Sequence, residues 1–273
     1  MGLQKIDYSL GCALVTGGSS GIGRGIAEEL ASRGVRQLVL VARREDQLAE
    51  TAATIERDTP GVLVRTISVD LSTPEGPTEV QRQIAAWGWE VELLVNDAGF
   101  ARKEVFAEDP ESDTALAAID LMVRAPVDLM LRFLPDMKRR RRGGVLNLGS
   151  TAGHQPVPYS ATYAASKAFV ISFSQAVREE YRDSGVRIAC IVPGVTETNL
   201  DGQGHGERRG ALDYVGIDQP ADVAKVAVDA LEANDPARVV GLNNKMLQAV
   251  LNATPDSLSA RLIAAVRGAP EQQ

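Results

Sequence analysis

A short apolar run, Cys12-Ala13-Leu14-Val15-Thr16, leads directly into the glycine-rich segment Gly17-Gly18-Ser19-Ser20-Gly21-Ile22-Gly23. Residues 24–33 then carry apolar side chains at helical spacing, so the pattern predicts a strand, a tight turn and a helix. Missing side chains let the backbone approach an anion, and the free N–H groups of a helix N-terminus favour negative charge. The spacing differs from the commoner G-x-G-x-x-G fingerprint. Because structural turns also use glycine and serine, the segment alone is a candidate phosphate site and no more.

Strand and helix patterns alternate along the 273 residues. This alternation predicts a single α/β domain over residues 1–273, a Rossmann-type doubly wound parallel sheet of about seven strands with helices on both faces. Strands are expected at residues 13–16, 37–41, 64–69, 93–96, 144–148 and 187–192, with a weak one at 237–240. Helices are expected at 22–32, 45–57, 74–86, 113–137 and 161–183, another from Pro220, and a C-terminal helical segment at 243–267 interrupted by Pro255.

Composition excludes several classes of protein. The net charge of -7 argues against a nucleic-acid partner. No stretch approaches the roughly 18 apolar residues that suggest a membrane span, and residues 1–10 lack a signal-peptide pattern. Cys12 and Cys190 fall in predicted strands, so we expect reduced packing residues in a cytoplasmic protein. No metal site is expected, because His154 has no second His or Cys at compatible spacing.

The clearest chemical signal is the pair Tyr163 and Lys167, four residues apart, with Ser150 upstream of them. Residues at i and i+4 of a helix are neighbours. A free phenol, with a pKa of about 10, is a poor acid near neutral pH, but an adjacent ammonium favours the phenolate. A serine that hydrogen-bonds a carbonyl oxygen would complete a device for moving a proton on and off that oxygen.

A further strand pattern ends in the small-residue turn Asn96-Asp97-Ala98-Gly99. Thr16-Gly17-x3-Gly21-x-Gly23, Asn96-x-Ala98-Gly99, Ser150, Tyr163-x3-Lys167 and Pro193-Gly194 occur in the order seen in the short-chain dehydrogenase/reductase superfamily. The chain resembles that superfamily from about residue 10 to about residue 200.

The resemblance implies a role for each matching residue. Ser150 would orient and polarise a substrate carbonyl, Tyr163 would be the general acid in reduction, and Lys167 would hold the nicotinamide ribose. Tyr163 and Lys167 would thus also contact the cofactor. The other implied cofactor contacts are Gly17, Ser19, Ser20, Gly21 and Ile22 at the phosphates, Asn96, Ala98 and Gly99 at the centre, and Pro193, Gly194, Val195, Thr196 and Thr198 over the nicotinamide.

Charge at the second predicted strand indicates which dinucleotide binds. An NAD site commonly has a carboxylate at this strand end for the ribose hydroxyls, whereas this chain has Ala42 followed by Arg43 and Arg44. Two guanidinium groups suit a 2′-phosphate, so NADP(H) is the expected cofactor. The alternative is that both arginines are ordinary surface charges. Asp70 and Leu71, after the third strand, are expected at the adenine end.

One position departs from the family pattern. The family commonly carries a catalytic Asn that would align with Met122, where it holds a water linking the lysine to solvent. A thioether accepts only weakly and donates nothing. Asp120 or Asp97 could rebuild the relay, the position could have been altered to capture an inactive complex, or the fold could serve without ordinary turnover.

The sequence says little about which substrate binds. Met122, Ser150, His154 and Tyr159 are the candidate substrate contacts, and residues 195–215 would form a lid. His154 is as consistent with a plain loop position as with the pocket. A medium-sized ketone, aldehyde or secondary alcohol of apolar character fits, and so do many others.

Two further features bear on partners. The basic run 138–142 follows a predicted helix, where positive charge suits the C-terminus, so a structural role is favoured over a nucleic-acid patch. The predicted helices 113–137 and 161–183 carry more apolar residues than one sheet face needs. Because the family often pairs these helices across a two-fold axis, a homodimer or homotetramer is expected.

Two classes of function therefore stay open. One is an enzyme that transfers a hydride between NADP(H) and a carbonyl or secondary alcohol. The other is a non-redox protein on the same fold, either a repurposed catalyst or a nucleotide-sensing binder. Intact Ser150, Tyr163 and Lys167 favour the enzyme, and Met122 favours the second class.

Overall fold

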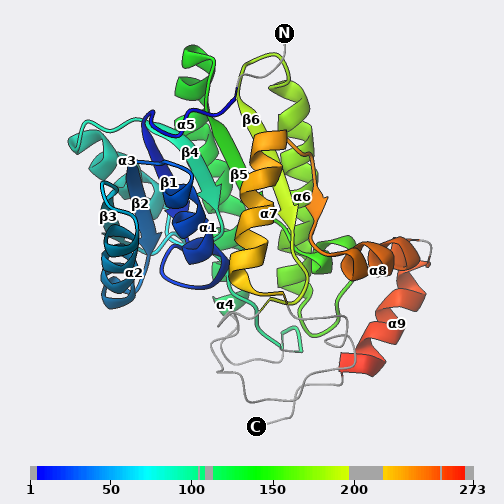
Figure 1. The fold of residues 1–273 in the computed structure, drawn as a ribbon. Helices are drawn as coiled ribbons and strands as arrows, with labels where there is room; N and C mark the ends of the chain where they lie inside the picture. Colours follow the sequence, from blue (N-terminus) through cyan, green and yellow to red (C-terminus); the bar gives the residue numbers. More distant parts are fainter. Residues whose placement is uncertain (1–4, 104, 108–112, 197–217, 253, 268–273) are drawn as a thin grey trace.

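A computed structural model of the chain describes residues 5–103, 105–107, 113–196, 218–252 and 254–267. Its centre is a parallel sheet of seven strands in the order β3-β2-β1-β4-β5-β6-β7 (Figure 1). The strands are β1 (Cys12–Thr16), β2 (Gln37–Ala42), β3 (Leu63–Ser68), β4 (Val91–Asn96), β5 (Gly144–Leu148), β6 (Arg187–Val192) and β7 (Arg238–Val239). The predicted doubly wound α/β fold is confirmed.

Helices cover both faces of this sheet (Figure 1). They are α1 (Gly21–Ser32), α2 (Glu45–Asp58), α3 (Glu75–Ala86), α4 (Asp113–Ile119), the π-helical turn η1 (Asp120–Arg124), α5 (Ala125–Arg140), the 3-10 turn η2 (Thr151–His154), α6 (Ala161–Glu180), α7 (Pro220–Ala233), α8 (Leu242–Asn252) and α9 (Asp256–Arg267). Among the described residues, no helix is both long and apolar enough to cross a membrane.

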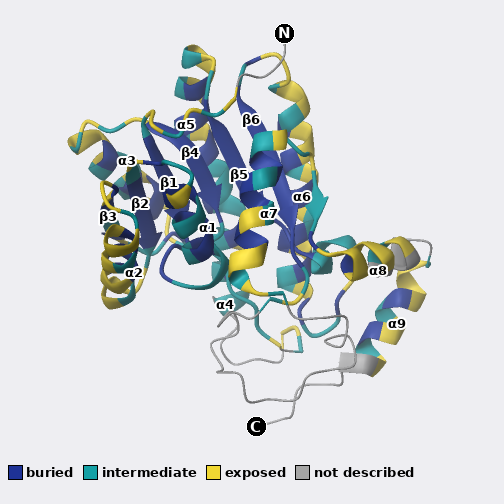
Figure 2. Ribbon diagram, in the orientation of Figure 1, coloured by how far each residue is buried: buried dark blue, intermediate teal, exposed yellow. Residues whose placement is uncertain are grey.

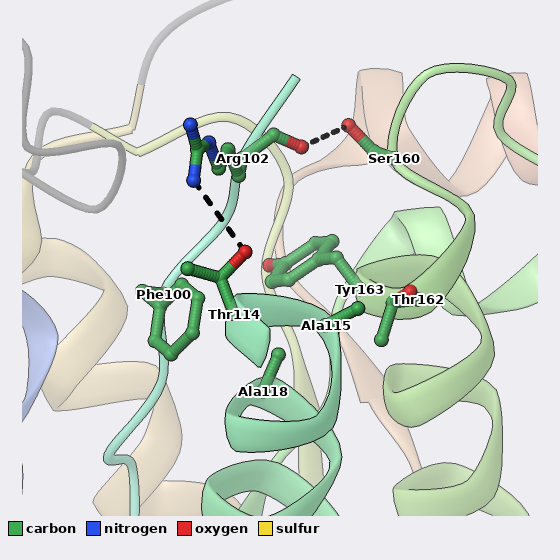
Figure 3. A pocket seen from close by; sticks show the side chains of 8 residues that line it. All are labelled: Phe100, Arg102, Thr114, Ala115, Ala118, Ser160, Thr162 and Tyr163. Atoms are coloured by element: carbon green, nitrogen blue, oxygen red, sulfur yellow. Dashed lines mark hydrogen bonds between the residues drawn. The ribbon is translucent and has the colours of Figure 1, made fainter. Parts of the chain in front are cut away.

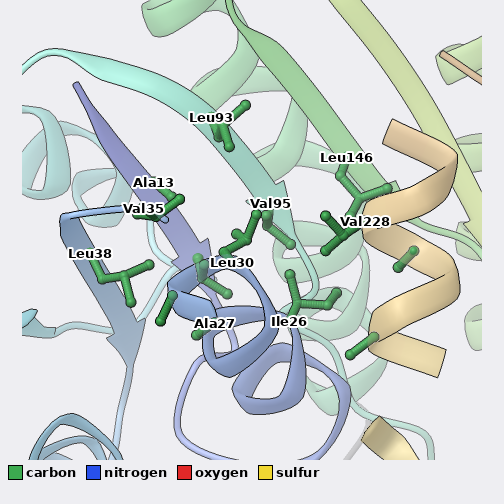
Figure 4. Close-up of a cluster of buried hydrophobic side chains, with 14 of the residues drawn as sticks. Ala13, Ile26, Ala27, Leu30, Val35, Leu38, Leu93, Val95, Leu146 and Val228 are labelled. Atoms are coloured by element: carbon green, nitrogen blue, oxygen red, sulfur yellow. The ribbon is translucent and has the colours of Figure 1, made fainter. Parts of the chain in front are cut away.

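The core is divided between the two faces of the sheet. On one face Ile26, Ala27 and Leu30 of α1 meet Val228 of α7 over β1 and β4 (Figure 4). On the other, α3 and α5 bury Val80, Leu129 and their neighbours against the same strands. The central strands are buried along their whole length, as expected where both faces are covered (Figure 2).

The strand order reverses beside β1, and this reversal positions the site. β1 pairs with β2 on one side and with β4 on the other, so a crevice opens at the C-terminal ends of β1 and β4. Doubly wound sheets bind ligands at such a switch point. The glycine-rich loop follows β1, and the Asn96-Asp97-Ala98-Gly99 turn follows β4, so the crevice lies between the two motifs.

One predicted helix differs in the structure. Residues 113–137 were expected to form a single α-helix, but a π turn at Asp120–Arg124 separates α4 from α5, which runs on to Arg140. The Ala125 N–H donates to the Asp120 carbonyl, five residues back. Pro126 is the next residue and has no N–H to donate in a regular helical hydrogen bond. The wider turn is therefore where the helix departs from its ordinary hydrogen-bond pattern.

Both cysteines are free and buried. Cys12 is on β1 and Cys190 on β6, with β4 and β5 between them. Burial raises the pKa of the Cys12 thiol to about 12 and that of Cys190 to about 11. The expected packing role of both residues agrees with this placement.

Candidate active site

The glycine-rich loop leaves room at the start of α1 for a ligand to approach the backbone. Gly17 and Gly21 have φ angles of +72° and +57°, which favour glycine. Ser20 precedes the helix, and its side chain makes no capping hydrogen bond. The Ser20 side chain therefore does not compete for the N–H groups at the start of α1, and such groups bind phosphate.

Thr16 ties the two motif turns together. Its hydroxyl donates to the Val95 carbonyl at 3.1 Å and accepts from the N–H groups of Asp97 at 3.0 Å and Ala98 at 3.1 Å. The ends of β1 and β4 are thereby held in register at the floor of the crevice.

Ser150 follows β5 and begins η2. Its Oγ accepts the Ala152 N–H at 3.2 Å, which fixes the hydroxyl beside α6. Gly153 makes the close packing possible, because a Cβ there would stand 2.7 Å from the Lys167 carbonyl carbon. The structure therefore presses the turn that carries Ser150 against the turn of α6 that carries Lys167.

Tyr163 and Lys167 share one face of α6, as their spacing predicts. The Lys167 Nζ lies 5.8 Å from the Tyr163 ring centroid and donates to the Leu148 carbonyl at 2.8 Å. The lysine side chain is buried, whereas Tyr163 is half-buried at the edge of a pocket. The structure thus holds a buried ammonium near the phenol ring.

Asn96 begins a buried polar chain behind these residues. Its Nδ2 donates to Asn147 Oδ1 at 2.8 Å, and Asn147 Nδ2 donates to Ser174 Oγ at 2.9 Å. Asn96 Oδ1 has no partner within the described ranges. A buried acceptor without a donor is expected to bind a ligand group or a water, which agrees with the implied place of Asn96 at the centre of a dinucleotide.

The two carboxylates proposed for a rebuilt relay have different surroundings. Asp120 is paired with Arg124 at 2.7 Å, and Arg124 also donates to the Ser72 carbonyl at 2.8 Å. Asp97 instead interacts with Lys167. Burial raises the pKa of Asp97 and the charge of Lys167 acts to lower it, which favours Asp97 over Asp120 as the carboxylate that acts on the lysine.

Met122 lies in the π turn and is 1% exposed. A Cβ added at Gly99 would stand 3.2 Å from its sulfur. The thioether thus packs beneath the Asn96-Asp97-Ala98-Gly99 turn. A substrate that contacted the sulfur would have to approach it beside Gly99.

The residues expected at the adenine end lie at one edge of the crevice. Arg43 and Arg44 are exposed between β2 and α2, beside Ala42. Asp70 Oδ1 accepts from the Ser72 N–H at 2.9 Å and hydroxyl at 2.7 Å, and Leu71 is buried. The structure thus offers exposed guanidinium groups and no carboxylate at the end of β2.

At the nicotinamide end the described chain stops after Thr196. The Pro193 carbonyl accepts from Thr151, and Thr196 donates to the Gly194 carbonyl at 3.3 Å. Val195 is 44% exposed. Thr198 and most of the expected lid, residues 197–215, lie outside the described residues. Sequence reasoning missed Asn244, whose side chain occupies the space a Cβ at Gly194 would need.

A small pocket opens beside Tyr163, between the loop after β4 and the starts of α4 and α6 (Figure 3). Arg102 donates to Thr114 at 3.4 Å, and Ser160 donates to the Arg102 carbonyl at 3.1 Å. Sequence reasoning missed this pocket, because apart from Tyr163 its residues belong to no motif. The residues that line it are Phe100, Arg102, Thr114, Ala115, Ala118, Ser160, Thr162 and Tyr163.

The predicted substrate residues His154 and Tyr159 flank this region without lining that pocket. His154 is half-buried, burial lowers its pKa, and its Nε2 has no partner in the described part of the chain. Tyr159 has a φ of +63°, a rare conformation for a bulky residue. Backbone strain of this kind clusters at functional sites.

Comparison with known proteins agrees with this geometry. The family model for short chain dehydrogenase matches residues 11–208. An uncharacterized oxidoreductase from Staphylococcus saprophyticus is 36% identical over 221 residues, covering 81% of this chain and 90% of that protein. The rat very-long-chain 3-oxoacyl-CoA reductase is 37% identical over 191 residues, which cover 69% of this chain but 60% of the relative.

A solved short-chain dehydrogenase from Sphingobium yanoikuyae, in complex with NADPH, is 26% identical with a TM-score of 0.77 and covers 97% of this chain and 99% of that one. The fold and the site define a nicotinamide-dependent oxidoreductase. The chain belongs to the short-chain dehydrogenase family.

Proposed function

We propose that this protein is an NADP(H)-dependent reductase that transfers a hydride between the nicotinamide and a ketone, an aldehyde or a secondary alcohol. The observation that carries the proposal is the convergence of Ser150, Tyr163 and Lys167 beside a glycine-rich cradle. The turn that carries Ser150 packs against the turn of α6 that carries Lys167, and the Lys167 Nζ lies 5.8 Å from the Tyr163 ring centroid. A binding module has no need of an ammonium held beside a phenol.

The residues divide the chemistry between them. When bound, the cofactor supplies or accepts the hydride. The Ser150 hydroxyl, fixed by the Ala152 N–H, would donate to the substrate carbonyl oxygen and polarise it. Tyr163 would give its phenol proton to that oxygen as charge develops there. Lys167, held by the Leu148 carbonyl, would stabilise the phenolate that remains.

The residues around the crevice fit a dinucleotide. The bare loop and the start of α1, which the Ser20 side chain does not cap, suit the diphosphate, and the Asn96 oxygen, unpartnered among the described residues, suits the centre. Pro193, Gly194, Val195 and Thr196, together with Thr198, would cover the nicotinamide. Exposed Arg43 and Arg44 beside Ala42 support NADP(H) over NAD(H).

For the substrate we propose a medium-sized, partly apolar carbonyl compound. Tyr163 opens onto a pocket with Phe100, Ala115 and Ala118 on its wall, and His154 and Tyr159 lie nearby in sequence. His154 is neutral near pH 7, because burial lowers its pKa, so it would hydrogen-bond a polar substrate group without adding charge. The rat relative's name makes acyl thioester ketones one class to test.

Met122 is the observation that favours a second candidate, a non-redox protein on this fold. It removes the usual amide and fills its place with a buried thioether. Such a protein would bind the dinucleotide and show no turnover with any carbonyl compound.

We also propose that residues 1–273 form one domain, because the two core clusters share the same sheet. The two buried free thiols support a reducing, cytoplasmic location. Small-molecule carbonyls or alcohols are the proposed partners, together with copies of this chain.

The test is a panel of ketones, aldehydes and secondary alcohols, followed by NADPH absorbance, with Tyr163→Phe as the matched control. The ring still packs in the variant, but the transferable proton is absent. We expect loss of turnover of at least a hundredfold with NADPH affinity nearly unchanged. Turnover by the variant, or NADPH binding without turnover of any compound by the wild type, would contradict the enzyme proposal.

A further inference from the structure

The carboxylate of Asp97 lies directly beneath the glycine-rich loop. A Cβ added at Gly23 would stand 2.6 Å from Asp97 Oδ2, and a Cβ added at Gly17 would stand 2.9 Å from it. The carboxylate therefore fills the space that two missing side chains leave open. It reaches there from the turn after β4, whose backbone is fixed by Thr16.

Asp97 also acts as a cap for α1 from outside the helix. Ser20, at the N-cap position, makes no side-chain capping bond. Gly23 is the third residue of the helix, and its N–H, one of those a helix leaves unpaired, donates to the Asp97 carboxylate. A negative charge is thus placed at the positive end of α1, where a cofactor diphosphate would bind.

The groups that face Asp97 come from three elements. α1 presents the Gly23 N–H, β1 presents the neutral Thr16 hydroxyl, and α6 presents the Lys167 ammonium. Burial raises the pKa of Asp97 to about 6, although Lys167 and the Gly23 N–H act in the opposite direction. The residue therefore carries a charge at pH 7.5 and loses most of it at pH 5.

We propose that the charge on Asp97 sets the affinity of the glycine-rich loop for the anionic diphosphate of the dinucleotide. An ionised carboxylate weakens binding by repulsion, while protonation or replacement by an amide removes the charge and strengthens binding. The inference rests on the proposed dinucleotide site. It identifies Asp97 as a positioning residue, since its action passes through the loop and α1.

Asp97→Asn is the matched variant, because an amide oxygen still accepts from Gly23 while the charge is gone. The probe is NAD⁺, which has no 2′-phosphate that would itself titrate near pH 6. Dissociation constants are measured by protein fluorescence at pH 7.5 and pH 5. At pH 7.5 we expect the variant to bind about three- to tenfold more tightly than the wild type. At pH 5 the two affinities should converge.

Adenosine 2′-phosphate serves as the ligand control, since it contacts the arginine end and lacks the diphosphate. Its affinity should be the same for both proteins. Asp97→Ala removes the cap as well as the charge, so we expect a lower melting temperature than for Asp97→Asn. These results together separate repulsion from a purely structural role.

Equal dissociation constants of wild type and Asp97→Asn for NAD⁺ at pH 7.5 would overturn the inference. So would an equal gain with adenosine 2′-phosphate. Absence of dinucleotide binding by both proteins would overturn the proposed function itself, and is readily told apart from equal binding. If Asp97→Asn does not fold, the wild-type affinity for NAD⁺ must still rise between pH 7.5 and pH 5; a flat profile would overturn the inference.

Discussion

At the residue scale, the proposed chemistry depends on a few side chains whose identity matters more than their size. In the proposed reaction, Ser150, Tyr163 and Lys167 would each supply one function. Three residues distinguish this chain: Arg43 and Arg44 at one end of the crevice, and Met122 behind the other end. Each supports a prediction about binding or turnover.

The double change Arg43→Ala and Arg44→Ala should lower the affinity for NADPH at least tenfold and leave the affinity for NADH nearly unchanged. One charge-assisted hydrogen bond contributes about 1.5–3 kcal/mol, which is a factor of ten or more. Fluorescence titration of both dinucleotides measures the change. Arg57→Ala on α2, which also removes an exposed positive charge, is the control. Equal loss for both dinucleotides would show that the arginines do not read the 2′-phosphate.

Met122→Asn should raise steady-state turnover or shift its pH dependence, if the missing amide limits proton resupply. The first hydride transfer, measured in a single turnover, should stay the same. Met122→Leu keeps an apolar group of similar volume without the amide, and serves as the control. A higher KM alone would instead mean that the position shapes the substrate wall. No change in either assay would mean that another group, such as Asp97, has replaced the relay.

At the element scale, the site depends on how closely η2 packs against α6. The turn carries Ser150 and the helix carries Tyr163 and Lys167, so their mutual distance is set by backbone contact. Gly153 is the residue that permits the contact, with a Cβ there meeting Ala168 N at 2.8 Å as well as the Lys167 backbone.

Gly153→Ala should therefore push the turn away from the helix. We expect a loss of about 1–3 kcal/mol in the free energy of unfolding, as in other overpacked sites, and at least a tenfold fall in kcat. Gly88→Ala is the control, because its φ of +68° makes an Ala strained while nothing lies near the new methyl group. It should lose stability without losing kcat. Unchanged kcat in Gly153→Ala would show that the contact does not position Ser150.

At the scale of the whole molecule, charged side chains join segments that are distant in sequence. The basic run predicted to be structural has such contacts. Glu92, 7% exposed at its side chain, meets Arg142 at 3.2 Å and Arg140 at 3.6 Å. Arg140 also donates to the Val91 carbonyl at 2.8 Å, and Lys138 lies over the Tyr181 ring. The arginine contacts fasten the end of α5 to the start of β4, and the Lys138 contact joins α5 to the end of α6.

Glu92→Gln should lower the free energy of unfolding by about 2–4 kcal/mol, because it leaves buried positive charge uncompensated. Urea unfolding followed by circular dichroism measures it. Glu179→Gln on α6 removes an exposed partner of Arg182 and should cost under about 1 kcal/mol. A similarly small loss in the free energy of unfolding of both variants would show that Glu92 does not compensate buried positive charge.

Self-association belongs to the same scale. Leu116, Leu131 and Phe169 on α4, α5 and α6 are 64%, 71% and 39% exposed, so one copy leaves these helices partly uncovered (Figure 2). We expect a dimer or tetramer by light scattering at micromolar concentration, and a lower mass for the double variant Leu131→Glu and Phe169→Glu. A monomeric mass for the wild type would contradict this.

The sequence by itself determined the strands, nearly all the helices and the family, because apolar periodicity and turn glycines report local conformation directly. It also named Tyr163 and Lys167, whose spacing follows from helix geometry, and Ser150, which the family pattern indicated. The tertiary structure alone decided the rest. The π turn just before Pro126 depends on how the helix packs there. Apart from Tyr163, the pocket at Arg102 is formed by segments that no motif marks. The sequence likewise left Asp97 and Asp120 as equal candidates for the relay. The pair of Asp120 with Arg124 follows from their i,i+4 spacing, but only the packing of strand ends against helices brings Asp97 beneath the glycine loop, since distances across a sheet are not encoded in local spacing.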